Sequence, residues 1–202
     1  MILGQGVVDA KSNGIAAIPE LLKVLKLQGA LVTIDAAGCQ KAIAEQIVAG
    51  GGDYLLAVKK NRPKLFESVE KNFLDGHENG FENRVHSEFV KKEQGYGRIE
   101  EQHVHVLENP VGLPGGWSGV KSVIQVHRER TAKGKTSRTT HYSICSMTGS
   151  AEELGHLIRR HWAIENECTG YTTWCSARTR TGPATATRAR ISGRLGGWRY
   201  RC

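Results

Sequence analysis

Two acidic residues occupy positions in which a carboxylate could bind a metal ion or act in catalysis, and the first is Asp35. It directly follows the apolar run Ala30–Ile34, and such runs are typical of strands buried on both faces of a parallel sheet. Ligand-binding and catalytic groups of open α/β sheets collect at the carboxyl ends of strands. Asp35 is therefore a candidate site residue, although an aspartate at a strand-to-helix junction can equally be a turn residue or helix cap.

The second carboxylate, Glu165, lies on a predicted helix that begins with the capping-box pattern Ser150-Ala151-Glu152-Glu153. At about 100° per residue, Glu165 falls on an apolar stripe of this helix. The stripe consists of Leu154, Leu157, Ile158 and His161. A carboxylate on an apolar face is costly unless it is paired or binds a metal. The alternatives are a helix that frays before Glu165, or an ion pair with Arg159 or Arg160.

Two carboxylates that meet at a sheet edge suit a hard divalent cation, Mg²⁺ or Mn²⁺, which takes oxygen ligands and phosphate oxygens. Such metal ions activate water and stabilise the leaving oxygen in phosphodiester cleavage. A site of this kind normally needs three acids, and the sequence shows no convincing third acid near a strand end. The predicted metal ligands are therefore Asp35 and Glu165, and His161 is expected to be packed or hydrogen-bonded rather than a ligand.

Helices and short apolar strands alternate in the first part of the chain. The spacing of apolar residues predicts helices from Pro19, over Gln40–Val48, and from Pro63 to about Leu74, with Pro19 in the first turn of its helix. Apolar strands at Ala30–Ile34 and Tyr54–Val58 separate them. This alternation predicts an α/β sheet.

The pattern changes after the third predicted helix. Polar and apolar residues alternate from Val85 to Leu107 and again from Val123 to Ser146, and Ala132-Lys133-Gly134-Lys135 has the composition of a hairpin turn. We therefore expect mainly antiparallel sheet in this part of the chain.

The basic residues are concentrated at the end of the chain. The formal net charge is +8, but residues 167–202 contain seven Arg and one acid, whereas the rest of the chain has 21 basic and 19 acidic side chains. Net charge alone is thus weak evidence for nucleic-acid binding. With one Leu, one Ile and neither Val nor Phe, residues 167–202 are predicted to be a disordered basic tail, which could attract DNA.

The composition also argues against several classes of protein. The apolar runs are too short to span a bilayer, and the first residues do not resemble a secretory signal, so we expect the cytoplasm as the location and no membrane partner. The five cysteines form no CxxC pair, which disfavours a disulfide framework or a zinc site.

A set of segments, in order and over residues 1–166, resembles the DDE transposases of bacterial insertion sequences, in the branch of the H-repeat-associated proteins. The segments are Asp9–Asn13, Ile18–Leu22, Val32–Ala36 with Cys39-Gln40, Gly51–Tyr54 with Leu56–Lys59, Gly97–Glu100 and His161–Asn166. By motif position, Asp35 is the family's second catalytic Asp and Glu165 its catalytic Glu. The family's first Asp lies on an earlier strand, in a segment that precedes the start of this chain.

The resemblance implies an α/β fold: a partial ribonuclease-H-like core that lacks its first strands, with a β-rich insertion before the last catalytic helix. On this basis residues 1–75 form the partial core, 76–148 the insertion and 149–166 the catalytic helix, followed by the tail at 167–202.

The implied function is DNA transposition, by metal-dependent phosphodiester cleavage and strand transfer at the ends of an insertion sequence. DNA is the implied partner, with a homodimer on DNA in the intact family. With two of three acids, this chain is predicted to be inactive. The alternatives are a ribonuclease-H-like nuclease and a non-catalytic DNA-binding remnant. Lys60, Asn61 and Arg98 are candidates for contacts to DNA phosphate. The alternative for Lys60 and Asn61 is a solvated loop without a binding role, and the alternative for Arg98 is a surface ion pair.

After Asn166 the resemblance stops. Residues 167–187 can be back-translated into codons and read again in the frame that begins at the third base of each codon. This frame permits an amino-acid sequence that resembles the family's continuation. We therefore expect a one-base deletion near codon 167, so that the chain is a truncated, frameshifted copy and its tail has no adapted role.

Overall fold

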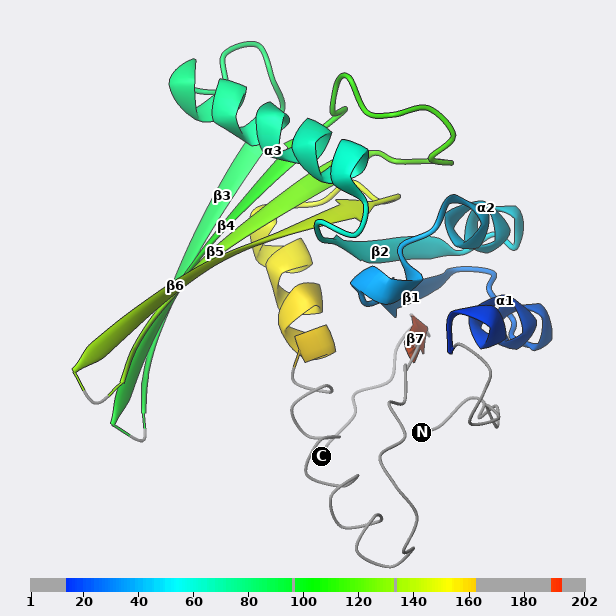
Figure 1. The fold of residues 1–202 in the computed structure, drawn as a ribbon, viewed down its shortest axis with the longest axis horizontal. Helices are drawn as coiled ribbons and strands as arrows, with labels where there is room; N and C mark the ends of the chain where they lie inside the picture. The colour runs from blue at the N-terminus through cyan, green and yellow to red at the C-terminus, as the bar shows by residue number, and fades with distance from the viewer. Residues whose placement is uncertain (1–13, 96, 133, 163–189, 194–202) are drawn as a thin grey trace, which may run out of the picture.

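One seven-stranded sheet organises the part of the chain that the structure, a computed structural model, describes: residues 14–95, 97–132, 134–162 and 190–193. The strand order is β3-β4-β5-β6-β2-β1-β7, and helices lie on both faces of the sheet (Figure 1). The predicted α/β class is confirmed. No helix in these residues is long and apolar enough to cross a membrane.

The elements follow the order that the sequence predicts. The helices are α1 (Gly14–Val24), the short 3-10 helix η1 (Ala36–Gly38), α2 (Lys41–Ala49), α3 (Pro63–Glu78) and a last helix over residues 151–162. The strands are β1 (Ala30–Ile34), β2 (Asp53–Val58), β3 (His86–Gly95), β4 (Arg98–Glu108), β5 (Ser122–Ala132), β6 (Lys135–Cys145) and β7 (Arg190–Gly193).

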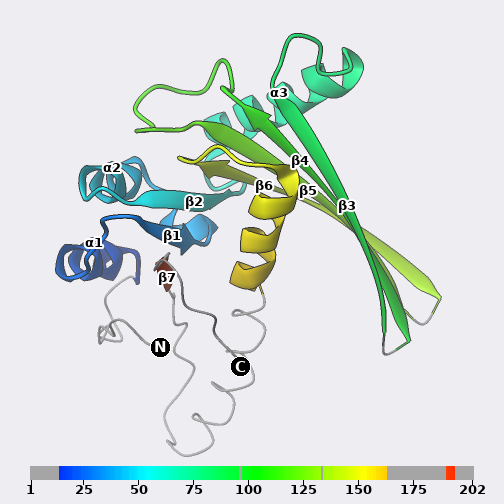
Figure 2. The same cartoon turned by 180° about the vertical axis from the view of Figure 1, so that it is seen from behind.

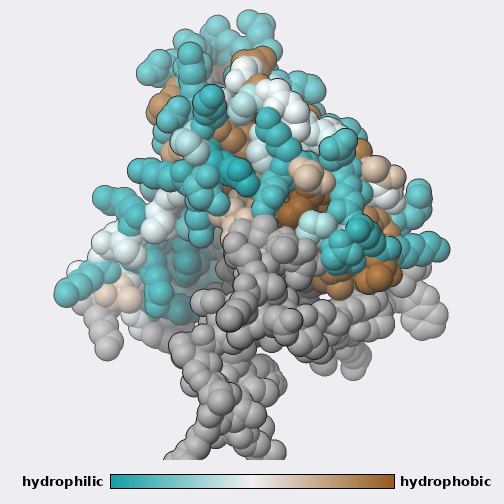
Figure 3. Space-filling model, turned by 45° about the vertical axis from the view of Figure 1, so that its right-hand side comes forward, coloured by the Kyte–Doolittle hydropathy of each residue, from teal (hydrophilic) through white to brown (hydrophobic). Residues whose placement is uncertain are grey.

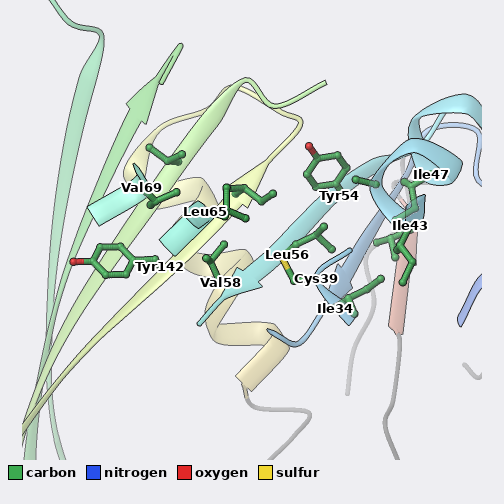
Figure 4. Packing of buried hydrophobic residues seen from close by; sticks show 14 of the residues in the cluster. Ile34, Cys39, Ile43, Ile47, Tyr54, Leu56, Val58, Leu65, Val69 and Tyr142 are labelled. Atoms are coloured by element: carbon green, nitrogen blue, oxygen red, sulfur yellow. The ribbon is translucent and has the colours of Figure 1, made fainter. Parts of the chain in front are cut away.

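The parallel pair β1–β2 lies between two apolar layers. The strands pair from Leu31↔Asp53 to Ile34↔Leu56, and this parallel pair must be covered on both faces because its strands carry apolar side chains on both. On one face, Ile34 and Leu56 pack in one buried cluster with Ile43 of α2 (Figure 4). On the other face, Leu31 and Leu55 share a second cluster with side chains of helix 151–162.

The β-rich segment continues the same sheet. Strands β3 to β6 pair antiparallel in sequence order, and β6 pairs antiparallel with β2. The predicted hairpin is confirmed, since β5 ends at Ala132 and β6 begins at Lys135, with Gly134 at φ +73. A left-handed conformation of this kind favours glycine. Strands β3 to β6 are longer than β1 and β2 and project beyond the helices as a twisted arm (Figures 1 and 2).

Opposite faces of the antiparallel strands bind different helices. Helix α3 covers one face, where its buried residues pack against Leu107, Val123 and Tyr142. Helix 151–162 covers the other, where Leu154 and Ile158 pack with strand residues. The apolar stripe predicted for this last helix is therefore confirmed over the described residues. Outside these contacts the visible surface is mostly hydrophilic, with small apolar areas (Figure 3).

The predicted capping box of the last helix is also confirmed. The Ser150 hydroxyl accepts from the Glu153 amide at 3.3 Å, and the Glu153 carboxylate accepts from the Ser150 amide at 3.2 Å. This reciprocal pair satisfies two amides that a helix start leaves without partners. The sequence therefore determines the start of the helix that the structure describes as far as Trp162.

Two predicted helix boundaries are wrong. Helix α1 begins at Gly14, so Pro19 lies inside the helix rather than in its first turn; the helix tolerates the loss of one backbone hydrogen bond there. Helix α3 continues to Glu78, beyond Leu74. In its last turns, Phe81 packs so closely over Gly76 that a Cβ there would lie 2.2 Å from the ring.

The tail at 167–202 is described at four residues only. Arg190–Gly193 form β7, antiparallel to β1, and so differ from the expectation of disorder. The rest of that segment lies outside the described residues, as do Met1 to Asn13 and Glu165.

A histidine cluster lies on the same face of the antiparallel strands as α3, beside the buried contacts of that helix. A shallow pocket there is lined by His77, His103, His105, Gln125 and His127. His86 Nε2 lies 3.2 Å from His105 Nδ1, which requires one of the two nitrogens to be unprotonated. Burial lowers the pKa of His105 to about 4, against a favourable contribution from Glu88 to the charged form, and burial also lowers the pKa of His86.

We predict that His105 makes folding stability depend on pH. The folded protein keeps His105 neutral down to a pH of about 4, whereas the unfolded chain takes up a proton below its ordinary pKa of 6.5. The free energy of unfolding should therefore fall as the pH drops from 6.5 to 4, by at most about 1.4 kcal/mol per pH unit for one proton. Urea unfolding of wild type and His105→Gln across this range measures the effect. Equal slopes for the two proteins would contradict it.

Candidate functional site

Asp35 directly follows the parallel strand β1 and begins the loop after it. Its backbone is extended (φ −67, ψ 174), and its Oδ1 accepts from the Gly38 amide at 3.3 Å, which caps η1. The sequence analysis gave a helix cap as the alternative role of Asp35, and the structure shows that Asp35 does cap η1. No other hydrogen bond or ion pair of this half-buried carboxylate occurs within the described part of the chain. One carboxylate oxygen is thus available to a ligand while the other orders the loop.

The loop between β2 and α3 supports the Asp35 loop. Asn61 Nδ2 donates to the carbonyl of Ala36 at 2.7 Å, and Arg62 Nε donates to the carbonyl of Cys39 at 2.9 Å. Both bonds hold backbone within four residues of Asp35. Asn61, predicted from the sequence as a DNA contact, therefore has a positioning contact as well, and Arg62 is a positioning residue that the sequence analysis did not identify.

The last helix meets β1 beside Asp35. His161 Nδ1 lies 3.1 Å from Thr33 Oγ1, and Trp162 packs on His141 of β6 with ring centroids 4.9 Å apart. His161 is thus hydrogen-bonded, as the sequence predicts. The sequence analysis did not identify Thr33, although a polar residue within an apolar strand run was a usable signal.

The contact between His161 and Thr33 relates the two candidate carboxylates. Thr33 and Asp35 lie two positions apart along extended backbone, so they belong to the same face of the sheet. Glu165 lies four residues after His161, which is about one helical turn, but it is outside the described residues. Its distance from Asp35 therefore stays a prediction.

The other predicted contacts to DNA lie on the surface. Lys60 is exposed in the turn after β2, and Arg98 is exposed at the start of β4. Neither side chain has an ion pair with a described carboxylate. Within the described residues, no three His, Cys, Asp or Glu side chains come together as a metal site.

The described cysteines do not have the character of nucleophiles. Cys39 and Cys145 are free and fully buried. Burial raises the pKa of the Cys39 thiol to about 12 and that of Cys145 to about 11. Because the thiolate is the reactive form, these two residues serve the core rather than catalysis.

Several proteins of Escherichia coli are similar to this chain. YncI of strain O157:H7, named as a candidate transposase, is 39% identical over 176 residues, which are 82% of this chain and 43% of YncI. YhhI of strain K12, named as an H repeat-associated candidate transposase, is 36% identical over 175 residues, 83% of this chain and 45% of YhhI. YbfL of strain K12 is 37% identical over 175 residues, which are 83% of this chain and 45% of YbfL.

The chain thus spans less than half the length of these relatives. No solved structure matches it. The family described as the transposase DDE domain matches residues 1–181. This match extends past Asn166, so it marks no boundary at the codon where a frame change is expected. Because the match covers most of the chain and the H repeat-associated relatives agree with it, the chain belongs to the DDE transposase family.

Proposed function

We propose that this chain carries part of the active site of a transposase that cleaves DNA and transfers strands at the ends of an insertion sequence. The observation that carries the proposal is the contact of His161 with Thr33, which brings this residue of the last helix beside the strand that Asp35 follows. The DDE family normally uses a divalent metal. We assign Asp35 and Glu165 as its ligands, with Mg²⁺ or Mn²⁺ as the ion.

The residues present fit such an ion chemically. Asp35 caps η1 through one oxygen only, and carboxylate oxygens are the ligands that Mg²⁺ prefers. When bound, the ion would activate water and stabilise charge on the scissile phosphate. The Asn61 and Arg62 contacts to the loop keep the Asp35 carboxylate in place, and the His161 contact keeps the last helix against β1.

We further propose that these 202 residues do not cleave DNA by themselves. In the part of the chain that the structure describes, no three His, Cys, Asp or Glu side chains come together as a metal site. Asp35 and Glu165 make a set of two carboxylates, whereas a two-metal site of this kind needs three. The alternatives, a ribonuclease-H-like nuclease and a DNA-binding remnant without catalysis, differ from this proposal in whether DNA is cut and whether element ends are required.

We predict that Fe²⁺, as a substitute for Mg²⁺, will cleave the backbone of the chain at two separate segments. With ascorbate and peroxide, radicals formed at the bound ion should cut near Asp35 and near Glu165, because both are ligands of one ion. Mass spectrometry of the fragments gives the positions. Asp35→Asn and Glu165→Gln should each abolish both cuts, while the control Asp53→Asn, at the opposite end of the parallel pair, should leave them unchanged. Cuts at one segment only would refute the convergence.

We predict that the purified chain will not nick a duplex that carries the ends of its element in the presence of Mg²⁺ or Mn²⁺. The measurement is gel analysis of labelled strands after prolonged incubation. Nicking that Asp35→Ala abolishes would show that two carboxylates suffice. Such nicking without any need for element ends would instead support the nuclease alternative.

We predict that Asn61 acts on the Asp35 loop more than on DNA. Asn61→Ala removes the bond to the carbonyl of Ala36, and a net loss of about 1 kcal/mol corresponds to roughly fivefold faster amide exchange at Gly38 and Cys39. The neighbouring exposed Lys60→Ala is the control and should leave the exchange unchanged. Hydrogen exchange followed by mass spectrometry measures both variants, and equal protection in all three proteins would contradict the positioning role.

A further inference from the structure

The projecting arm has two chemically different faces. We define the arm as residues 90–103 and 127–140, the parts of β3 to β6 beyond the helices. Side chains alternate between faces along each strand, and the registers align them across the sheet. The helix face, on the side of helix 151–162, carries the charged residues Lys91, Glu93, Arg98, Glu100, Arg128, Arg130 and Lys135. The histidine face carries Lys92, Glu101, Glu129 and Arg138, with His103 and His127.

The two faces differ in how their charges are paired. On the histidine face, Lys92 pairs with Glu101 at 3.3 Å and Arg138 with Glu129 at 2.6 Å, so each of these cations has a carboxylate partner. On the helix face, the described side chains include five cations and two carboxylates. Among the described residues of the arm, the basic excess is therefore on one side.

The two carboxylates of the helix face are already occupied. Glu100 receives two hydrogen bonds from Arg128, at 2.9 and 2.7 Å, and Glu93 binds Lys91 and Arg159 of the last helix. Three exposed cations remain, Arg98, Arg130 and Lys135, and no carboxylate among the described residues lies within ion-pair distance of them. We call these three the cation row.

The cation row continues the side of the sheet to which Asp35 belongs. The His161 contact with Thr33 lies on this side. His141 of β6, which packs on Trp162, belongs to the helix face as well. From His141, the exposed hydroxyls of Thr139 and Ser137 lead along β6 to Lys135. At about 3.4 Å per residue this path is about 20 Å long.

We propose that the helix face of the arm binds the phosphate backbone of double-stranded DNA whose cleavage site lies at Asp35. Successive phosphates of one strand are about 3.4 Å apart along the helix axis, so 20 Å corresponds to roughly six base pairs beside the scissile phosphate. Cations and hydroxyls are the groups that contact phosphate oxygens. The proposal rests on the proposed function, and it extends the candidate Arg98 to a surface that includes Arg130 and Lys135.

Paired charge variants test the proposal in the full chain. Arg130→Gln with Lys135→Gln removes two positive charges from the helix face, and Lys92→Gln with Arg138→Gln removes two from the histidine face. Binding of a fluorescent duplex is measured by anisotropy over a salt series without catalytic metal. The slope of log affinity against log salt should fall by roughly 2 in the first variant, since each lost phosphate contact contributes about 0.9, and should not change in the second. The tail is common to all proteins, and thermal unfolding checks that both variants fold.

Lysine footprinting of the wild type gives an independent readout. Bound duplex should slow acetylation of Lys135, as measured by peptide mass spectrometry, and leave Lys92 unaffected. If duplex binds but both variants lower the slope equally, or Lys135 is not protected, the arm proposal is overturned while the iron-cleavage result still stands for the site. If the chain binds no duplex at any salt concentration, both proposals fail.

Discussion

The parallel pairing of β1 with β2 is the constraint on which the rest of the molecule depends. Both strands are apolar on both sides, so the pair is stable only where both faces are covered. Helix α2 covers one face, and the other is left for helix 151–162, which the chain supplies more than a hundred residues later. Covering this second face brings His161 to Thr33. The packing requirement of the core therefore also assembles the candidate site.

The four antiparallel strands serve the core and the surface with different parts of their length. Near β2 their side chains are buried between α3 on one face and helix 151–162 on the other, as Val123 and Ile124 show. Farther out, the same alternation places charged residues on two exposed faces with different pairing. Because β6 pairs directly with β2, the arm has a fixed direction relative to the strand that ends in Asp35.

Much of this arrangement could be predicted from local patterns. The run Ala30–Ile34, the Ser150 capping box and the hairpin before Lys135 each indicated their element because the determining interactions lie within a few residues of each other. Helix boundaries were predicted less well, because the spacing of apolar residues does not mark where a helix begins or ends. Helix α3 extends past Leu74 into the turn where Phe81 packs over Gly76, and the position of Pro19 inside α1 could not be read from the spacing of apolar residues.

The sequence by itself determined the family, the alternation of elements and Asp35 as a candidate carboxylate at a strand end, because motifs and periodicities are local properties of the chain. Only the tertiary structure decided that Asp35 also caps η1 and that Asn61 and Arg62 hold its loop. It also decided that Arg98, Arg130 and Lys135 share one face with no ion pair to a carboxylate of the described residues. Those facts depend on which distant segments pack together, since burial and strand register, rather than sequence neighbours, select the partner of each polar group.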